Sequence, residues 1–528
     1  MAKILYRTRG MNSGVGFSPE IEDVSQATLL IRADANVAIG TGHVMRCLAL
    51  AQAWQDAGGK AVFAMEQVSP SIGERLQKES IGISEICAPA GTGEDAKNTV
   101  AIARECGASW IAVDGYRFGS DYQKALKADG VKALFLDDYC QDGPYSADVV
   151  LNQNISAEEY AYREREPHTR LLLGAKYCLL RREFAPWREW KREIIPFARR
   201  VLVTMGGSDP GNFTEKVIHA IAAMDCNDLE AAIVVGGSNP RAEALLELAE
   251  KSGKKMKLHR DISDMAELMS WADVAISAAG TTCWELCLLG LPSILVDLAD
   301  NQTAIAQGLD RRGCAIHVGR SDDVTPLKLA EALQRLLDCK ENRKNMSRRC
   351  RQLVDARGAS RVVSVLLGEE IRLRPAEERD IRLLWEWAND AQVRAAAFST
   401  ETIPWEIHAA WFATKLSDPD CRILISEEGN GRPIGQFRTD RRTGGDADIS
   451  VSLSREFRGK GYGGRLIEEG VAAAFAEGGV TQLHAFVKPD NLASRRSFEW
   501  AGFENLGEER VKGTAAIHYI RVKDARVE

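Results

Sequence analysis

A histidine directly follows a glycine-rich turn in the first part of the chain. The run Ile39-Gly40-Thr41-Gly42-His43 comes after an apolar stretch and leads straight into a helical one. Glycine lets backbone N–H groups approach an anion closely, and a helix N-terminus adds partial positive charge. The same positive end disfavours an imidazolium ion, so the sequence predicts a neutral, proton-accepting ring at His43. A helix cap or a surface histidine would explain the residue equally well.

Two more turns rich in small residues follow in the middle of the chain. Gly206-Gly207-Ser208-Asp209 comes after an apolar stretch, and Ala279-Gly280-Thr281-Thr282 precedes a helical stretch that carries Glu285. A turn of this kind suits a diphosphate, and a carboxylate one helical turn later can accept both ribose hydroxyls. Asn301 and Gln302 follow another apolar strand, at the carboxyl edge where open α/β sheets bind ligands. Taken singly, each feature could also be a strand end, a cap or a turn.

A third glycine-rich turn lies near the C-terminus. The run Arg458-Gly459-Lys460-Gly461-Tyr462-Gly463-Gly464 separates a strand expected at 449–453 from a helix expected at 465–476. Closely spaced glycines let consecutive N–H groups turn inward on a pyrophosphate, and Arg458 and Lys460 add positive charge. The alternative is a tight turn that merely joins a strand to a helix.

Alternating strand-like and helix-like blocks must position these turns. They run from residue 28 to 154 and again from 200 to 367, with a proline-containing segment between them. Such alternation predicts βαβ units and parallel sheets covered on both faces. After Gly368 the pattern changes to that of a mixed α+β domain. We therefore expect an N-terminal extension at 1–27, two Rossmann-type halves at 28–168 and 200–367, a connecting segment at 169–199, and a mixed α+β domain at 370–528.

The composition excludes several classes of protein. The 528 residues are too many for one hydrophobic core, and a net charge of −7 without a long basic run speaks against nucleic acid or an anionic membrane as partner. No apolar stretch is long enough to span a bilayer, and the N-terminus lacks the apolar core of a signal peptide. The 12 cysteines contain no CxxC pair, so Cys283 and Cys287 are interpreted as core residues rather than metal ligands. A cytoplasmic location is expected.

The order of the motifs in the first two thirds of the chain carries a family resemblance. IRADxxxxIGTGHxxR is followed by VDGY, LDD, MGGSDP, SAAGTTxxE and DNQ. This series resembles the UDP-sugar hydrolases of pseudaminic acid biosynthesis, which release UDP from UDP-2,4-diacetamido-2,4,6-trideoxy-β-L-altropyranose. Those hydrolases are relatives of the GT-B glycosyltransferase that makes lipid II. The likeness covers about residues 28–367 and implies a GT-B-like pair of Rossmann-type domains.

The resemblance also implies roles for individual residues. His43 would be the base that orients or deprotonates water at the anomeric carbon, and Asn301 would help to hold that water. Gly206, Gly207, Ser208 and Glu285 would bind UDP. The remaining substrate-binding positions implied by the motifs are Arg32, Asp34, Gly40, Gly42, Tyr116, Asp138 and Gln302.

The adjacent carboxylates Asp137 and Asp138 bear on the question of a metal. They are not the spaced DxD of many metal-dependent glycosyltransferases, and UDP is already a good leaving group that backbone dipoles can stabilise. No metal requirement is therefore expected. The pair would face the sugar, or else be two solvated carboxylates at the end of a strand.

The last domain resembles the GNAT N-acetyltransferases. The resemblance covers about residues 370–524 and is carried by RGKGYG, then the N-x-x-S that begins at Asn491, then AGF. It implies acetyl-CoA as cosubstrate, with the backbone near Leu453 pairing with the pantetheine arm and Asn491 contacting it. The implied cofactor-binding set is Leu453, Arg458, Gly459, Lys460, Gly461, Tyr462, Gly463 and Asn491.

The acid and base of this domain are less clearly indicated. Many GNAT members carry a tyrosine that protonates the departing thiolate, but Phe498 stands at the corresponding position and has no proton to give. Water, Ser497 or another residue would have to serve. Asp448, on the strand before the glycine turn, is the candidate base; a solvent-facing strand carboxylate is the alternative.

The fusion itself predicts an order of reactions. The pathway of the resembled hydrolase contains a GNAT that acetylates the 4-amino group of a UDP-linked trideoxyaltrose just before hydrolysis. Joining consecutive enzymes raises the local concentration of the shared intermediate. We therefore expect acetylation by residues 370–524 and release of UDP by residues 28–367, with a UDP-linked amino sugar and acetyl-CoA as partners. The alternatives are a GT-B glycosyltransferase with a sugar or lipid acceptor, and a last domain that senses acetyl-CoA or acetylates another amine; the sequence makes no prediction of the oligomeric state.

Overall fold

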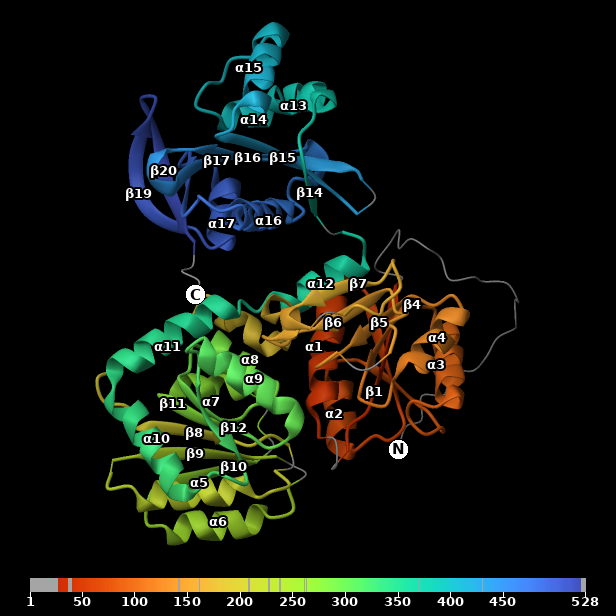
Figure 1. The fold of residues 1–528 in the computed structure, drawn as a ribbon, viewed down its shortest axis with the longest axis vertical. Helices are drawn as coiled ribbons and strands as arrows, with labels where there is room; N and C mark the ends of the chain where they lie inside the picture. The colour runs from red at the N-terminus through yellow and green to blue at the C-terminus, as the bar shows by residue number, and fades with distance from the viewer. Residues whose placement is uncertain are drawn as a thin grey trace. The chain divides into compact units, whose positions relative to one another are not determined.

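Two compact units make up the chain, Met1–Leu366 and Leu367–Glu528 (Figure 1). The computed structural model describes residues 27–36, 40–140, 143–160, 162–207, 209–226, 228–236, 239–260, 262, 264–369, 371–429 and 431–523. The extension expected at 1–27 therefore lies almost wholly outside the described residues. None of the helices within these ranges combines the length and the apolar character needed to cross a membrane.

The first unit begins with a seven-stranded, fully parallel sheet in the order β3-β2-β1-β4-β5-β6-β7. Strand β1 is buried along its whole length, which explains its apolar run of Leu29, Leu30 and Ile31: a parallel strand is covered by helices on both faces. The elements are β1 (Thr28–Ala33), α1 (Gly42–Asp56), β2 (Lys60–Met65), α2 (Pro70–Lys78), β3 (Gly82–Glu85), α3 (Gly93–Glu105), β4 (Ala108–Asp114), α4 (Ser120–Ala128), β5 (Ala133–Leu136), β6 (Val149–Asn152) and β7 (Arg170–Leu173).

The second half of this unit holds a six-stranded parallel sheet in the order β10-β9-β8-β11-β12-β13. This order reverses direction between β8 and β11, the kind of switch point at which open α/β sheets bind ligands. The elements are β8 (Arg200–Thr204), α5 (Phe213–Ala223), β9 (Glu230–Val235), α6 (Ala242–Lys251), β10 (Lys255–Arg260), α7 (Met265–Trp271), β11 (Val274–Ala278), α8 (Thr282–Leu288), β12 (Ser293–Asp297), α9 (Asp300–Arg311), β13 (Ile316–Arg320), α10 (Pro326–Asp338), α11 (Lys340–Leu353) and α12 (Gly358–Leu366). Cys283 and Cys287 are buried in its core.

Two segments lie differently from their expected domains. The connecting segment expected at 169–199 contains β7, which pairs with β6 and completes the first sheet. The helix α12 was assigned to the second half, yet it packs against α1 and the short helix Ala175–Tyr177 of the first. A Cβ atom at Gly358 would lie 2.1 Å from the carbonyl oxygen of Cys178, so only glycine allows this approach. Such long-range packing leaves no periodic signal in the sequence.

The second unit contains a mixed seven-stranded sheet in the order β14-β15-β16-β17-β18-β20-β19. All neighbours are antiparallel except β17 and β18, which are parallel and pair only through Asp446–Asp448 and Gln482–His484. Both strands continue beyond this pairing and therefore diverge. The elements are β14 (Arg372–Pro375), α13 (Ile381–Ala388), α14 (Ala391–Ala396), α15 (Trp405–Ser417), β15 (Cys421–Glu427), β16 (Pro433–Arg441), β17 (Asp446–Leu453), α16 (Tyr462–Ala476), β18 (Gln482–Val487), α17 (Leu492–Trp500), β19 (Glu504–Val511) and β20 (Thr514–Val522). The predicted fold class, two parallel-sheet halves followed by a mixed α+β domain, is confirmed.

Gly470 of α16 provides a test of the packing in the second unit. A Cβ atom there would lie 2.2 Å from the ring of Phe437 on β16, which is completely buried. Overpacking of this kind costs about 3 kcal/mol, more than the roughly 1 kcal/mol that alanine gains over glycine in a helix. We expect Gly470→Ala to lower the free energy of opening of this unit by about 2 kcal/mol, measured by hydrogen exchange at the amides of α16 and β16.

The matched control is the same substitution in a Phe437→Val background, where the ring is gone. There Gly470→Ala should be neutral or stabilising. An equal loss of stability in both backgrounds would show that the contact with Phe437 is not the cause.

Candidate active sites

His43 is held in a defined orientation by a buried carboxylate. It is the second residue of α1, and its Nδ1 lies 2.7 Å from Oδ1 of Asp114, the last residue of β4. His43 is 7% exposed and Asp114 is 1% exposed. A carboxylate at this distance accepts the Nδ1 proton and leaves the Nε2 lone pair available to accept another. The pairing gives His43 the arrangement of a general base.

Arg46, one helical turn after His43, joins two carboxylates. Its Nε and one terminal nitrogen each donate to Asp114 over 2.7 Å, and its other terminal nitrogen donates to Oδ1 of Asp138 over 2.6 Å. Burial by itself would raise the pKa of both carboxyl groups, but the guanidinium outweighs it and holds the pKa of Asp114 and of Asp138 below the usual range. Both side chains are therefore carboxylates at neutral pH.

The network continues into the second half of the first unit. The Tyr116 hydroxyl donates to Oδ2 of Asp138 over 3.0 Å and accepts from the side-chain amide of Asn301 over 2.6 Å. The Tyr116 ring also packs edge-on against the His43 ring, with centroids 4.8 Å apart. Four of the sequence-predicted site residues, His43, Tyr116, Asp138 and Asn301, are thus brought together.

Asp137 does not share this environment. Its Oδ2 accepts hydrogen bonds from the Tyr162 hydroxyl and the Cys140 backbone, and it is 4% exposed. The interpretation of Asp137 and Asp138 as solvated strand-end carboxylates is wrong, because the first is buried in the core and the second is bound to Arg46.

The other predicted residues of the first half lie around this cluster. Arg32 is completely buried, and its guanidinium pairs with Asp95 and with Oδ2 of Asp34, over 2.9 Å and 2.7 Å. This leaves Arg32 in a position to orient Asp34 rather than to touch a ligand. Gly40 has φ +73°, and a Cβ at Gly42 would lie 3.9 Å from Oγ1 of Thr281. The first glycine turn therefore lies close to the threonine turn of the second half.

The predicted nucleotide-binding residues lie at the carboxyl edge of the second sheet. Gly206 has φ +80° and opens the turn after β8, and a Cβ at Gly236 would lie 2.1 Å from the carbonyl oxygen of Gly207. Ser208 lies outside the described residues. Gln302 accepts a hydrogen bond from the Leu298 backbone over 2.9 Å, and its amide nitrogen lies 3.9 Å from the Cβ position of Gly280.

Glu285 has a charged partner that sequence reasoning missed. Arg181 donates to its Oε1 over 2.8 Å, and Arg181 also pairs with Glu183. Burial raises the pKa of Glu285, and Arg181 opposes that rise. The carboxylate that would accept ribose hydroxyls is thus already paired with a cation.

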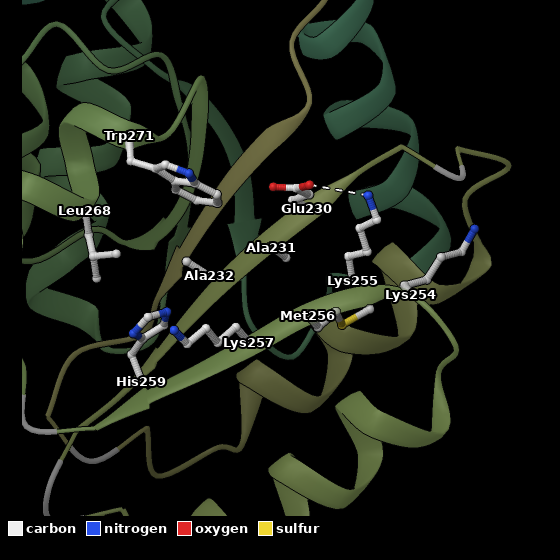
Figure 2. Close-up of a pocket in the computed structure, with 10 residues that line it drawn as sticks. All are labelled: Glu230, Ala231, Ala232, Lys254, Lys255, Met256, Lys257, His259, Leu268 and Trp271. Atoms are coloured by element: carbon white, nitrogen blue, oxygen red, sulfur yellow. Dashed lines mark hydrogen bonds and ion pairs between the residues drawn. The ribbon is translucent and has the colours of Figure 1, made fainter.

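A pocket of about 480 Å³ lies away from all of these residues (Figure 2). Its lining comes from β9, from the edge strand β10, where Lys255 pairs with Glu230, and from α7, which contributes Leu268 and Trp271; His259 lies at the opposite end of β10 from Lys255. Lysines on an exposed edge strand hinder pairing with another sheet. The pocket contains none of the predicted site residues.

In the second unit, the glycine turn has a left-handed backbone conformation at two positions. Gly459 has φ +74° and Gly461, the residue before α16, has φ +82°; a Cβ at either position would meet nothing within 4 Å. The backbone there is open to a ligand, and the exposed Lys460 lies between the two glycines. Gly463 differs, because a Cβ there would lie 2.8 Å from the Ser497 hydroxyl. Tyr462 is buried, and its hydroxyl donates to Glu428 over 2.9 Å.

Two other predicted cofactor residues make internal contacts. Arg458 donates twice to the carbonyl oxygen of Leu453, over 3.0 and 2.8 Å, and once to Asp390. The Asn491 side chain accepts from the Ser494 backbone over 3.2 Å and caps α17. Arg458 therefore stabilises the turn through its contacts with Leu453 and Asp390, and its charge is not directed towards the open backbone of the turn.

The candidate acid and base positions are also defined. Phe498 is buried against Phe503 and Tyr519 and belongs to the core. Asp448 is 38% exposed, but both of its oxygens are engaged by Arg442, the closer pair at 2.5 Å. Among the described residues, no three His, Cys, Asp or Glu side chains gather as they would around a metal ion.

Family models match both units of the chain. Residues 201–362 match the glycosyltransferase family 28 C-terminal domain, and residues 370–504 match the GNAT acetyltransferase domain. Together with the fold, these matches define a chain that joins a GT-B-like two-domain unit to a GNAT acetyltransferase domain.

Particular relatives refine this class. The UDP-2,4-diacetamido-2,4,6-trideoxy-β-L-altropyranose hydrolase of Campylobacter jejuni is 25% identical over 287 residues, 54% of this chain and 97% of its own. Protein MJ1062 of Methanocaldococcus jannaschii, an uncharacterized protein, is 22% identical over 512 residues, 91% of this chain and 98% of its own. The spore coat polysaccharide biosynthesis protein SpsG of Bacillus subtilis is 31% identical over 200 residues, 38% of this chain and 58% of its own. The chain is thus an enzyme in which a unit similar to UDP-sugar hydrolases is fused to a GNAT domain.

Arg46 gives a prediction about stability. Replacing it by methionine leaves two buried carboxylates without their cation, which should cost about 3–5 kcal/mol at neutral pH. In the wild type, the low folded-state pKa of Asp114 and Asp138 contributes stability that is present above about pH 4 and is lost as the pH falls further. The difference in unfolding free energy between wild type and Arg46→Met, measured by urea titration, should therefore be largest at pH 7 and shrink below about pH 4.

Lys216→Met serves as the comparison, because it removes a cation that hydrogen-bonds to the carbonyl oxygens of Ser321 and Val324 and lies over the Phe213 ring. A pH-independent difference for Arg46→Met would contradict the role given to the two carboxylates.

Proposed function

We propose that residues 28–367 hydrolyse a UDP-linked sugar and release UDP, with His43 as the base that activates water. The observation that supports this most directly is the 2.7 Å contact between His43 Nδ1 and Asp114, which leaves Nε2 as the proton acceptor. Asn301 would hold the water, because its amide is oriented by the Tyr116 hydroxyl beside the histidine ring.

In the proposed reaction, Nε2 of His43 takes a proton from water as the water oxygen attacks the anomeric carbon. The bond from that carbon to the phosphate oxygen breaks, and UDP leaves with the electron pair. Asp114, fixed as a carboxylate by Arg46, stabilises the imidazolium that forms. The turns after β8 and before α8 would bind the diphosphate and ribose. Binding of ribose at Glu285 would then exchange its contact with Arg181 for hydroxyl groups.

The substrate follows from the relative that matches almost over its whole length. The proposed substrate is UDP-2,4-diacetamido-2,4,6-trideoxy-β-L-altropyranose, the compound in the name of the Campylobacter hydrolase. Residues 370–524 would acetylate the 4-amino group of its precursor with acetyl-CoA, so that the two units act in sequence. The alignment with protein MJ1062, which spans both units, supports the fusion as an arrangement shared with another protein.

A glycosyltransferase is the second candidate, because the matching family model for residues 201–362 is that of glycosyltransferase family 28. It differs from the hydrolase in needing an acceptor other than water. UDP release that appears only after a sugar or lipid acceptor is added would favour it.

The first experiment is to measure UDP release from the diacetamido UDP-sugar without added metal or acceptor. We expect turnover by the wild type and a loss of about 10²–10⁴-fold in kcat for His43→Ala, the usual contribution of a general base. UDP affinity should stay within about twofold, because His43 acts on water and not on the nucleotide.

His219→Ala is the matched control, since His219 is an exposed histidine on α5 of the same unit. It should retain full activity. A folded wild type that binds UDP but releases none from this sugar would overturn the hydrolase proposal.

The GNAT unit is tested by closing its glycine turn. Gly461→Val puts a branched side chain at φ +82°, where the N–H groups must face the pyrophosphate. The dissociation constant for acetyl-CoA, measured by calorimetry, should rise by more than about 10-fold, and acetylation of the UDP-4-amino sugar should fall in parallel.

Gly478→Val is the matched control, because Gly478 has φ +79° and equally open surroundings in the same unit but lies outside the turn. It carries the same backbone strain. Equal loss of acetyl-CoA affinity in both variants would contradict the assignment of the turn.

A further inference from the structure

A row of polar side chains crosses three strands of the second unit. Gln482 and His484 lie on β18, His518 on β20 and Glu509 on β19. The Gln482 amide nitrogen is 3.0 Å from His484 Nε2, His484 Nδ1 is 2.9 Å from His518 Nε2, and His518 Nδ1 is 3.5 Å from Glu509 Oε2. Neither the glycine turn nor the aromatic core uses these groups.

The row lies on the sheet face opposite α16. Leu483, Ala485 and Val487 of β18 join the core cluster that contains Leu466 and Ile467 of α16. Because side chains alternate across a strand, His484 and Phe486 face the other way, and His518 stacks on both. The two histidines thus occupy the face away from the helix that follows the pyrophosphate turn.

The row also lies where the parallel strands separate. His484 pairs with Asp448 at the last position that β17 and β18 share, and beyond it the strands diverge. Beyond that position the facing backbone edges of β17 and β18 are no longer paired with each other, so an extended ligand chain can hydrogen-bond to them there. His484 lies at the last paired position.

The contacts define a direction for proton movement. When the Gln482 amide donates to His484 Nε2, His484 donates its Nδ1 proton to His518 Nε2, and His518 donates its Nδ1 proton towards Glu509. Both rings are then neutral, and a proton arriving at His484 Nε2 displaces one at the far end. Asp446, 3.3 Å from that nitrogen, would stabilise the arriving charge, and Glu509 is 46% exposed to solvent at the exit.

We propose that this row of Gln482, His484, His518 and Glu509 accepts the proton that the acceptor amine loses during acetyl transfer and passes it to solvent. The inference rests on the proposed acetyltransferase function. An ammonium ion gives up one proton to become a nucleophile, and the amine then attacks the thioester carbonyl. The carbon–nitrogen bond forms as the carbon–sulfur bond breaks, the thiolate leaves with the electron pair, and it takes up the second proton from nitrogen. One proton per turnover must therefore leave the site, and the row provides its path.

The groups around His518 favour a neutral ring at that position. Burial lowers the pKa of His518, the neighbouring His484 and Arg442 reinforce this, and Glu509 and Asp448 oppose it. Asp448 is a weaker candidate for the proton acceptor, because Arg442 holds both of its oxygens. His484 and His518 act here as relay residues between the amine and Glu509.

The test measures kcat/KM for acetylation of the UDP-4-amino sugar by the full chain between pH 5.5 and 9. We expect His518→Ala to lower kcat/KM at pH 7 by about 10–100-fold, with acetyl-CoA affinity unchanged, and added imidazole to restore part of the activity. The wild-type rate should fall as the pH drops and His518 becomes protonated, and this limb should be altered in His518→Ala. A purely structural histidine would give neither the altered limb nor the rescue.

If His518→Ala does not fold, a second pair of variants with smaller changes in the side chain tests the relay instead. Glu509→Gln should lower kcat/KM by several-fold, whereas Glu508→Gln, its exposed neighbour on β19, should not change it. Acetylation with a wild-type pH profile in both His518→Ala and Glu509→Gln would overturn the relay alone. Absence of acetylation by the wild type would overturn the proposed acetyltransferase substrate, and the relay with it.

Discussion

The first unit depends on one buried cation placed between two carboxylates. Arg46 projects from α1 to the ends of two adjacent strands, where Asp114 terminates β4 and Asp138 follows β5. Removing three charges from water is tolerable only because each has a hydrogen-bonded partner. The same arrangement anchors the helix that begins with the glycine turn, sets the tautomer of His43 through Asp114, and positions Tyr116 through Asp138. Structural stability and the orientation of the proposed catalytic groups thus depend on the same contacts.

The backbone of this enzyme could be predicted well from its sequence, because buried parallel strands and glycine turns have local signatures. β8 begins at residue 200, where the second alternating block is predicted to begin, and β17 ends at Leu453 as predicted, although it begins three residues earlier than expected. The partners of the predicted side chains could not be inferred in the same way. Asp114 is 71 residues from His43, and Arg181 is 104 residues from Glu285. Arg46, only one helical turn after His43, was the accessible signal, since an arginine beside a candidate base requires nearby carboxylates if it is buried.

The GNAT unit illustrates the same division between local and long-range information. The turn from Gly459 to Gly461 was recognisable because glycine spacing and left-handed backbone conformation go together. The inward turn of Arg458 onto Leu453 was not, because a basic residue in a glycine turn suggests a ligand contact first. The histidine row could not be inferred from the sequence, because His484 and His518 are 34 residues apart and each is a single histidine in its strand. Only the pairing of β18 with β20 makes them neighbours.

The hydrogen bond between Tyr116 and Asn301 couples chemistry to the docking of the two halves. The hydroxyl belongs to the half of the first unit that carries His43 on α1, and the amide belongs to α9 in the half with the proposed nucleotide turns. In the proposed hydrolysis, the amide that holds water points correctly only while its partner from the other half is present. If the two halves separate to admit substrate or to release UDP, Asn301 loses its contact with Tyr116 and no longer holds the attacking water. In the open enzyme, water would then not be positioned to hydrolyse the glycosyl bond. The moment of hydrolysis would be set by closure of the two halves rather than by exclusion of solvent.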